Sequence, residues 1–340
     1  MGGVFGMKIN PYHWIHNISI IAVSYILHYK TVLFGNSKQY NYKDLEQPYP
    51  KKPSWQLTFT HFQAKWFLDT SDATSKNQND SAFSLIAKQQ VSGGIKVFVI
   101  SPLVLKNKKK VLYLHGGAFI KCITQSHVDM LFDLANRIGC EFYVPLYTLA
   151  DHQLYPFQKK QVLNIYTALE KEFGARNLVL MGDSAGGNLA CGLIDDLISS
   201  EIPTPSKLIL ISPWLNLVFN HPDIIKYEER DKILSIKWLN SAIKKYVGNM
   251  AVPNLKNPKL SPIYLNNLSR FPTTLYFTGD ADMFFPDSIL FKEKSLKQGM
   301  KLHFVEIKGG FHVFPAAPAW FVPEANISRS QIASFVSQPD

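Results

Sequence analysis

The stretch NLVLMGDSAGGNLACGLIDDLISS, residues 177–200, decides how this chain folds. Its first part, 177–182, is mostly apolar and bounded by polar residues, which predicts a buried strand. A helix is expected directly afterwards, from Ser184 to about Ser199. The junction reads Gly182-Asp183-Ser184-Ala185-Gly186-Gly187 and matches the pattern G-x-S-x-G. In this setting the pattern predicts a tight strand-to-helix turn that raises a serine hydroxyl above the sheet.

Strands and helices are expected to alternate on both sides of this turn. Further strands are expected at 111–115, 141–147, 207–212, 273–279 and 301–307, and helices at 128–138, 157–173, 287–298 and from about 324. A hairpin is expected over 84–101, with its turn at Ser92-Gly93-Gly94. This alternation predicts an α/β fold with a mostly parallel central sheet flanked by helices on both faces.

The domain organisation is predicted from composition. Residues 1–80 are expected to form an amino-terminal helical cap or lid, because their aromatic residues lack a clear period and Pro, Asn, Ser and Asp cluster after position 35. Residues 81–340 are expected to form the main α/β domain, which includes a mostly helical cap insertion around 213–265.

Residues 14–33 raise the question of membrane association. No formally charged residue lies between Lys8 and Lys30, but the strongly apolar part, 18–27, is shorter than the roughly 20 residues that span a bilayer. We interpret this segment as a lid helix; the alternative is an anchor or interfacial helix. In that case the lysines that follow it would keep the body on the cytoplasmic side. No cleavage site follows the segment, so a cytoplasmic protein is expected.

Charge and cysteine patterns argue against several classes of function. The net charge of +10 is spread along the chain, and its densest run, 106–110, has no zinc-finger or RNA-binding signature beside it. A nucleic-acid partner is therefore not expected. The histidines and cysteines lack metal-ligand spacing, and there is no phosphate-binding glycine loop. The sequence predicts neither a metal nor a cofactor, and it leaves the oligomeric state open.

A serine nucleophile needs a base, and the base needs a carboxylate to orient it. His312, in the Gly-Gly loop after the last predicted strand, is the expected base, whereas His303 lies inside that strand and is expected to be structural. The loop after 273–279 offers the carboxylates Asp280, Asp282 and, further on, Asp287. Position alone does not decide between the first two.

The segment His115-Gly116-Gly117-Ala118-Phe119 follows the predicted strand 111–115. Glycines at this point allow backbone N–H groups to face a site without side-chain obstruction. Together with the N–H of Ala185 they are expected to bind the oxyanion of a tetrahedral intermediate. His115 itself is expected to fix the loop by a hydrogen bond.

Several motifs occur together in one order, from about 110 to 320. They are HGGAF (115–119), YTLADHQLYPF (147–157), GDSAGGN (182–188), SPWLNL (212–217), NPKLSP (257–262) and GGFHVF (309–314). In these motifs the chain resembles the hormone-sensitive-lipase-like group of α/β hydrolases, which includes bacterial carboxylesterases and arylacetamide deacetylases.

The resemblance implies a role for each matching residue. Ser184 would be the nucleophile, His312 the base and Asp282 the acid, because Asp282-Met283-Phe284 fits the group's acid motif better than Asp280 does. The oxyanion donors would be Gly117, Ala118 and Ala185, with Gly116 shaping the loop. The chain departs from the group at Ala118, where a third glycine is usual, and at Asp151 and His152, which replace a Pro-Glu pair.

The sequence therefore predicts a serine carboxylesterase that hydrolyses short- to medium-chain acyl esters through an acyl-enzyme intermediate. Its substrate pocket would be apolar, built from Phe119, Trp214 and the lid residues Trp14, Trp55, Trp66 and Phe67. One alternative is a membrane-tethered deacetylase of lipid-soluble acetyl esters, held through residues 14–33. Another is a non-catalytic ligand-binding module on the same fold.

Overall fold

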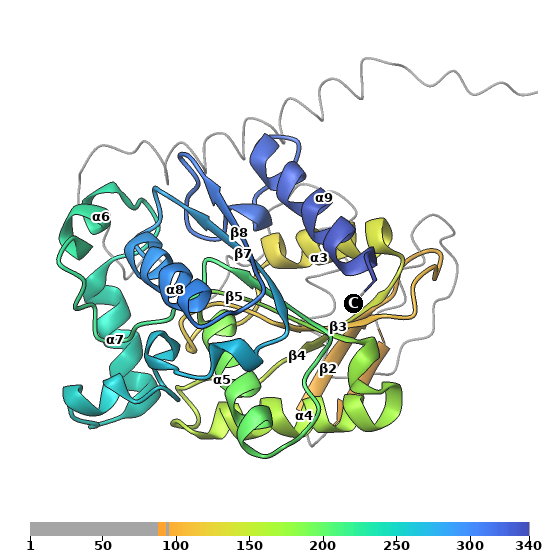
Figure 1. Cartoon of the computed structure of the whole chain (residues 1–340), viewed down its shortest axis with the longest axis horizontal. Coiled ribbons are helices and arrows are strands. Elements are labelled where there is room, and N and C mark those ends of the chain that lie inside the picture. The colour runs from red at the N-terminus through yellow and green to blue at the C-terminus, as the bar shows by residue number, and fades with distance from the viewer. Residues whose placement is uncertain (1–87, 93–94, 340) are drawn as a thin grey trace, which may run out of the picture. The chain divides into compact units, whose positions relative to one another are not determined.

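The computed structural model describes residues 88–92 and 95–339, and these form one eight-stranded sheet with helices on both faces (Figure 1). The strand order is β1-β2-β4-β3-β5-β6-β7-β8, in which β2 runs antiparallel to both of its neighbours, β1 and β4, and all other neighbouring strands pair in parallel. The strands are β1 (Lys88–Ser92), β2 (Ile95–Ile100), β3 (Lys110–Leu114), β4 (Glu141–Pro145), β5 (Leu178–Asp183), β6 (Lys207–Ile211), β7 (Thr273–Gly279) and β8 (Leu302–Ile307). The predicted fold class is confirmed.

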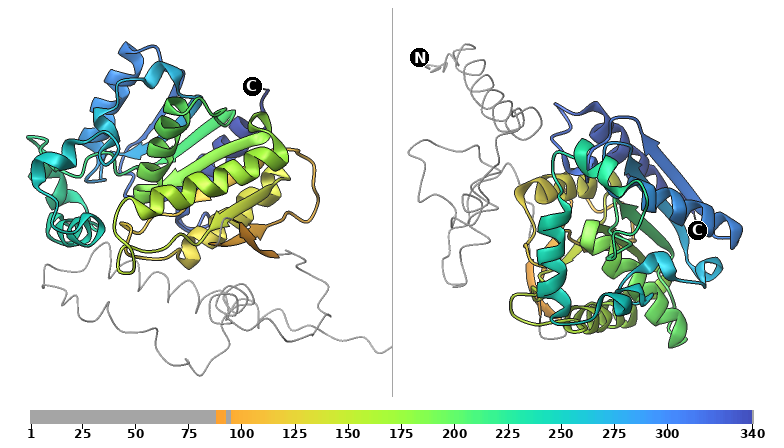
Figure 2. Two further views of the ribbon diagram at one scale, coloured as in Figure 1. Left: turned by 90° about the horizontal axis from the view of Figure 1, so that it is seen from below. Right: turned by 90° about the vertical axis from the view of Figure 1, so that its left-hand side faces the viewer.

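The helices cover the sheet in two layers. They are α3 (Gln125–Ile138), α4 (Phe157–Phe173), α5 (Ser184–Ser199), α6 (Ile224–Arg230), α7 (Ile236–Val247), α8 (Phe285–Lys297) and α9 (Pro323–Ser337). Helices α3 and α9 pack together on one face, and α4, α5 and α8 lie on the other (Figures 1 and 2).

The central strands are apolar on both sides because both faces are covered. In β5, Leu178 and Leu180 contribute to the core under α4 and α5, whereas Val179 and Met181 contribute to the core under α3 and α9. All four side chains are buried. This double burial explains why the strand appears in the sequence as a continuous apolar run.

Two helices begin earlier than the sequence predicts. Helix α3 starts at Gln125, because Thr124 forms a capping box with the side chain of His127 and so fixes a polar first turn that hydrophobic periodicity does not mark. Helix α8 starts at Phe285, with Pro286 in its first turn.

The segment between β6 and β7 carries α6, α7 and the short 3-10 turns η3 (Val252–Lys256) and η4 (Pro262–Tyr264). The rest of 213–265, where a mostly helical insertion is expected, is irregular chain. The predicted cap over 1–80 and the apolar segment 14–33 lie outside the described residues. Within the part that is described, no helix combines the length and apolarity needed to cross a membrane.

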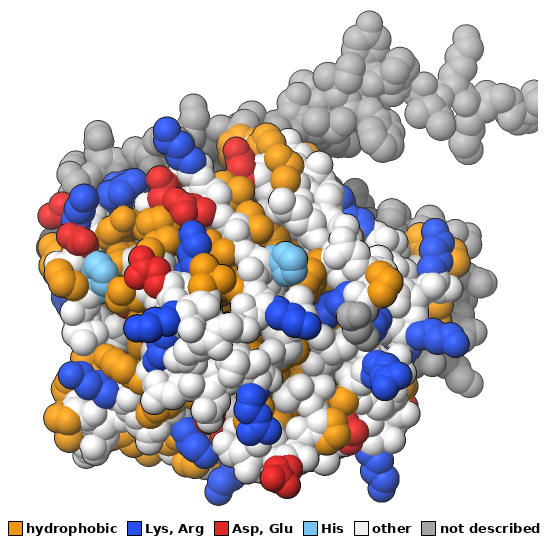
Figure 3. All heavy atoms as spheres, viewed as in Figure 1, with side chains coloured by type: hydrophobic (Ala, Val, Ile, Leu, Met, Phe, Trp, Pro, Cys, Tyr) orange, Lys and Arg blue, Asp and Glu red, His pale blue; other side chains and the backbone are white. Residues whose placement is uncertain are grey.

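Charged side chains are dispersed over the surface. On the face shown in Figure 3, lysine and arginine side chains alternate with acidic and hydrophobic ones and do not gather into one patch. This agrees with the diffuse positive charge of the sequence.

Candidate active site

The turn from β5 into α5 holds Ser184 in a strained backbone conformation. Strand β5 ends at Asp183 and α5 begins at the next residue, with Ser184 at a left-handed φ of 50°. The turn closes tightly because Gly186 has no side chain: a Cβ there would lie 1.9 Å from the carbonyl oxygen of Leu114 on β3. Strain of this kind persists only where the surrounding packing enforces it.

Ser184, His312 and Asp282 form one hydrogen-bonded chain. The distance from Ser184 Oγ to His312 Nε2 is 3.0 Å, and the distance from His312 Nδ1 to Asp282 Oδ2 is also 3.0 Å. The three side chains follow the carboxyl ends of β5, β8 and β7, which meet at one edge of a parallel sheet. The structure thus brings together the three residues predicted as nucleophile, base and acid.

The geometry distinguishes among the candidate carboxylates. Asp282 is fully buried against His312. Asp280 instead accepts the backbone N–H of Gly309 and lies 4.0 Å from Arg230. Asp287 lies on α8 and accepts a hydrogen bond from Asn216, and burial raises its pKa to about 6. Of these acids, Asp282 is the one that contacts the histidine.

The other candidate histidine lies elsewhere. His303 is exposed on β8, where its ring meets Phe335 edge-on at 5.8 Å. It therefore has a surface position on the strand, as expected for a residue outside the site.

Three carboxylates act on His312. Burial alone would lower the pKa of this imidazole, but Asp282, Asp231 and Asp183 together raise it above its ordinary value. The site therefore favours the imidazolium form, which a base needs after it has accepted a proton.

The loop after β3 presents backbone amides. Gly117 and Ala118 have left-handed φ values of 111° and 52°, and neither amide donates a hydrogen bond within the described part of the chain. The N–H of Ala185 lies in the first turn of α5, where amides have no helical acceptor. Gly116 differs, because its N–H donates to Asp183 Oδ1 at 2.8 Å. Its part is to shape the loop.

Asp183 is a site residue that the sequence reasoning missed. Its buried carboxylate accepts hydrogen bonds from the Tyr113 hydroxyl, the Gly116 amide and His127 Nε2, the last at 3.0 Å. Burial would raise its pKa, but these partners lower it below the ordinary value. The network joins the serine turn to the amide loop. The sequence did offer a signal for this residue, because Asp183 is an acidic side chain directly after a mostly apolar predicted strand.

His115 makes a further hydrogen bond within the same loop. Its Nδ1 lies 2.7 Å from the carbonyl oxygen of Gly116, and its ring stacks on Tyr147 at 4.3 Å. Burial lowers the pKa of His115 to about 4, so the ring is neutral and Nδ1 is the donor. This agrees with the expectation that His115 holds the loop.

An aromatic cluster backs the site. Phe119 stacks on Trp214 and on Tyr246, and Trp214 stacks on Phe284 at 5.7 Å. Both predicted pocket residues, Phe119 and Trp214, are fully buried in this cluster. The backbone N–H of Trp214 also donates to the carbonyl oxygen of Ser184 at 2.9 Å. The four predicted lid aromatics lie outside the described residues.

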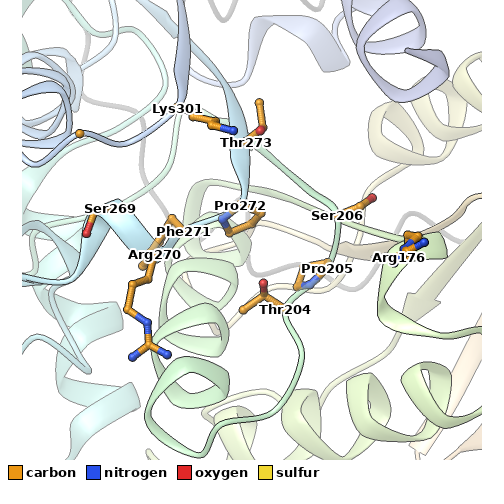
Figure 4. A pocket seen from close by; sticks show the side chains of 11 residues that line it. Arg176, Thr204, Pro205, Ser206, Ser269, Arg270, Phe271, Pro272, Thr273 and Lys301 are labelled. Atoms are coloured by element: carbon orange, nitrogen blue, oxygen red, sulfur yellow. The ribbon is translucent and has the colours of Figure 1, made fainter. Parts of the chain in front are cut away.

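A cavity of about 690 Å³ lies at the opposite end of the sheet. Its walls come from the turns at the amino ends of β6 and β7, including Ser206 and Thr273, with Arg270 directed away from the centre (Figure 4). The Ser184 hydroxyl lies beyond the carboxyl ends of the strands, so this cavity does not belong to the site.

Comparison with known proteins agrees with this architecture. A family model described as the alpha/beta hydrolase fold matches residues 111–316. The chain belongs to this family.

Individual relatives of this α/β hydrolase are esterases and related hydrolases. The chain is 32% identical over 231 residues to an esterase of Acinetobacter venetianus, and the match covers 68% of this chain and 75% of the relative. It is 26% identical over 216 residues to an acetyl-hydrolase of Streptomyces hygroscopicus, covering 63% and 70%. A crystal structure of a hormone-sensitive lipase from a metagenome library superposes with a TM-score of 0.69 at 26% identity, covering 74% of this chain and 84% of that one. The predicted resemblance to the hormone-sensitive-lipase-like group is confirmed.

Proposed function

We propose that this α/β hydrolase is a serine carboxylesterase that cleaves short- to medium-chain acyl esters. The observation that carries the proposal is the unbroken hydrogen-bonded chain from Ser184 through His312 to Asp282. The esterase and acetyl-hydrolase relatives support the same reaction class.

The first half of the reaction follows from the orientation of the imidazole. Ser184 Oγ attacks the ester carbonyl while His312 Nε2 accepts its proton. Because Nδ1 faces Asp282, the neutral ring carries its proton there and leaves Nε2 free as the base. The raised pKa of His312 stabilises the imidazolium that forms. The same proton then passes to the leaving alcohol.

The tetrahedral intermediate carries a negative oxygen that needs hydrogen-bond donors. We assign this role to the backbone amides of Gly117, Ala118 and Ala185. They belong to a loop and a helix that the Asp183 network holds together, so the donors require little rearrangement during the reaction. Water then attacks the acyl-enzyme, with His312 again as the base, and releases the acid.

Two measurements test this proposal. Ser184→Ala is expected to abolish hydrolysis of p-nitrophenyl acetate and labelling by a fluorophosphonate probe. A series of p-nitrophenyl esters from acetate to palmitate is expected to give its highest kcat/KM between two and eight acyl carbons. A Ser184→Ala protein that hydrolyses the acetate ester at the parent rate would disprove the assignment.

The second candidate is a membrane-tethered deacetylase of lipid-soluble acetyl esters. The acetyl-hydrolase relative and the apolar segment 14–33 favour it. It shares the chemistry and differs in substrate and location, with the catalytic body still on the cytoplasmic side. Fractionation of the full chain, with and without Ile20→Asp and Val23→Asp, distinguishes the two. If the parent protein is found in the membrane fraction and the double variant is not, the tethered form is favoured.

A further inference from the structure

A second buried carboxylate touches the loop that carries the acid. Asp231 directly follows α6, in the segment between β6 and β7, and is 7% exposed. Its Oδ1 accepts the backbone N–H groups of Ile233 at 2.7 Å and Leu234 at 3.0 Å. Its Oδ2 accepts the N–H of Met283 at 2.8 Å, across 52 residues of sequence. One side chain therefore connects the turn before α7 to the residue after Asp282.

This contact completes the support of the acid. Asp282 Oδ1 accepts the N–H of Phe284 at 2.8 Å, which leaves Oδ2 for His312. Asp231 holds the intervening Met283 amide, and the ring of Phe284 meets the His312 ring edge-on at 5.2 Å. The loop is thus fixed at consecutive residues, so that the carboxylate of Asp282 keeps one orientation.

Charge is the second contribution of Asp231. All three of its hydrogen bonds are accepted from backbone amides, which is the role of an ionised carboxylate. Burial and the neighbouring Asp282 raise the pKa of Asp231 above its ordinary value, although His312 and the turn amides oppose the rise. In return, Asp231 acts with Asp282 and Asp183 to raise the pKa of His312.

We propose that Asp231 is a positioning residue of the active site, which fixes the acid loop through the Met283 amide and adds negative charge beside the base. The inference rests on the proposed triad. Through this one side chain, the segment between β6 and β7 supports the orientation of Asp282.

The test compares Asp231→Asn with Glu228→Gln in the full-length protein. Glu228 is a matched control, since its carboxylate accepts the N–H of Ile236 at the start of α7, in the same segment. Asparagine removes the negative charge. Its NH₂ group cannot accept a hydrogen bond, so one of the two oxygens that now accept backbone N–H groups is lost. Loss of a negative charge lowers the pKa of His312, so the acidic limb of the kcat/KM profile is expected to move to lower pH by roughly 0.5–1 unit. The plateau is expected to fall roughly tenfold.

Glu228→Gln is expected to leave the acidic limb at the parent position. An unshifted limb in a folded Asp231→Asn protein, or an equal shift in Glu228→Gln, overturns the proposal. If Asp231→Asn does not fold, Asp231→Glu provides the second measurement. It keeps the charge and displaces the carboxylate, so the plateau is expected to fall with the limb unmoved, and a parent-like plateau overturns the proposal. Activity remaining in Ser184→Ala would instead refute the proposed function, so failure of the proposed function can be told apart from failure of the proposal for Asp231.

Discussion

Replacing Gly186 with alanine tests whether the close contact between α5 and β3 sets the geometry of the site. An added Cβ would lie 1.9 Å from the Leu114 carbonyl oxygen and 2.7 Å from that of His115. Real Cβ contacts below 3.0 Å essentially do not occur, so helix and strand must separate by about 1 Å. Both obstacles are backbone atoms, which no side-chain rotation can relieve.

The expected loss follows from where this separation occurs. The residues that must move continue directly into the amide loop, whereas Ser184 moves with α5. A displacement of about 1 Å between catalytic groups can cost on the order of 100-fold in rate. Overpacking of this kind typically costs about 1–3 kcal/mol of stability. We therefore expect Gly186→Ala to lower kcat/KM about 100-fold and to lower Tm by several degrees.

The matched control is Gly192→Ala, on the same helix. A Cβ there meets only the flexible end of the Lys159 side chain, at 3.0 Å. Alanine is also more favourable than glycine inside a helix by about 1 kcal/mol. We expect its kcat/KM to stay within about threefold of the parent. Both variants are measured by ester hydrolysis and thermal unfolding. Parent-like activity and Tm in Gly186→Ala would refute the reasoning.

Three further predictions follow from the carboxylates and the base. Asp282→Asn is expected to lower kcat by roughly 10³–10⁴-fold, whereas Asp280→Asn, which removes no contact to His312, should change kcat less than about threefold. Steady-state kinetics measures both variants, and equal losses would contradict the assignment of Asp282 as the acid. The acidic limb of the kcat/KM profile is expected to have its midpoint above the ordinary histidine pKa of about 6.5, because the carboxylates around His312 raise its pKa; a midpoint below that value would be inconsistent with the buried site. Asp287→Asn is expected to stabilise the protein by up to about 3 kcal/mol at pH 8 and to have little effect at pH 4. The reason is that a carboxyl whose pKa is about 6 in the folded state binds its proton more tightly there than in the unfolded state, so it destabilises the fold as the pH rises through that value. Denaturant unfolding at the two pH values checks the sign.

Local sequence patterns predicted the regular elements well where one signal dominated. Helix α4 at 157–173 and strand β7 at 273–279 have the predicted bounds, because their apolar spacing continues to both ends. The start of α3 was wrong by three residues, since a capping box and not an apolar residue begins that helix. Motif order and the strand-to-helix turn identified Ser184 and His312 as partners before any distance was known.

Side chains that act across long stretches of sequence were harder to predict. Position alone left Asp280 and Asp282 equivalent, and the resemblance favoured the one that the structure places against His312. Asp183 and Asp231 were missed, because each contacts its partners only after the chain has folded. Asp231 is bonded to Met283 across 52 residues, and no periodicity or short motif marks such a pair.

The position of the proposed base has a consequence for inactivation. His312 is carried by the loop after β8, and β8 is an edge strand of the described sheet, paired with β7 and containing several partly exposed residues. Ser184, in contrast, follows β5 at the centre. Peripheral strands open at lower free energy than central ones. On warming, the imidazole should therefore separate from the hydroxyl while most helical circular dichroism is retained, so that the enzyme loses turnover before it melts.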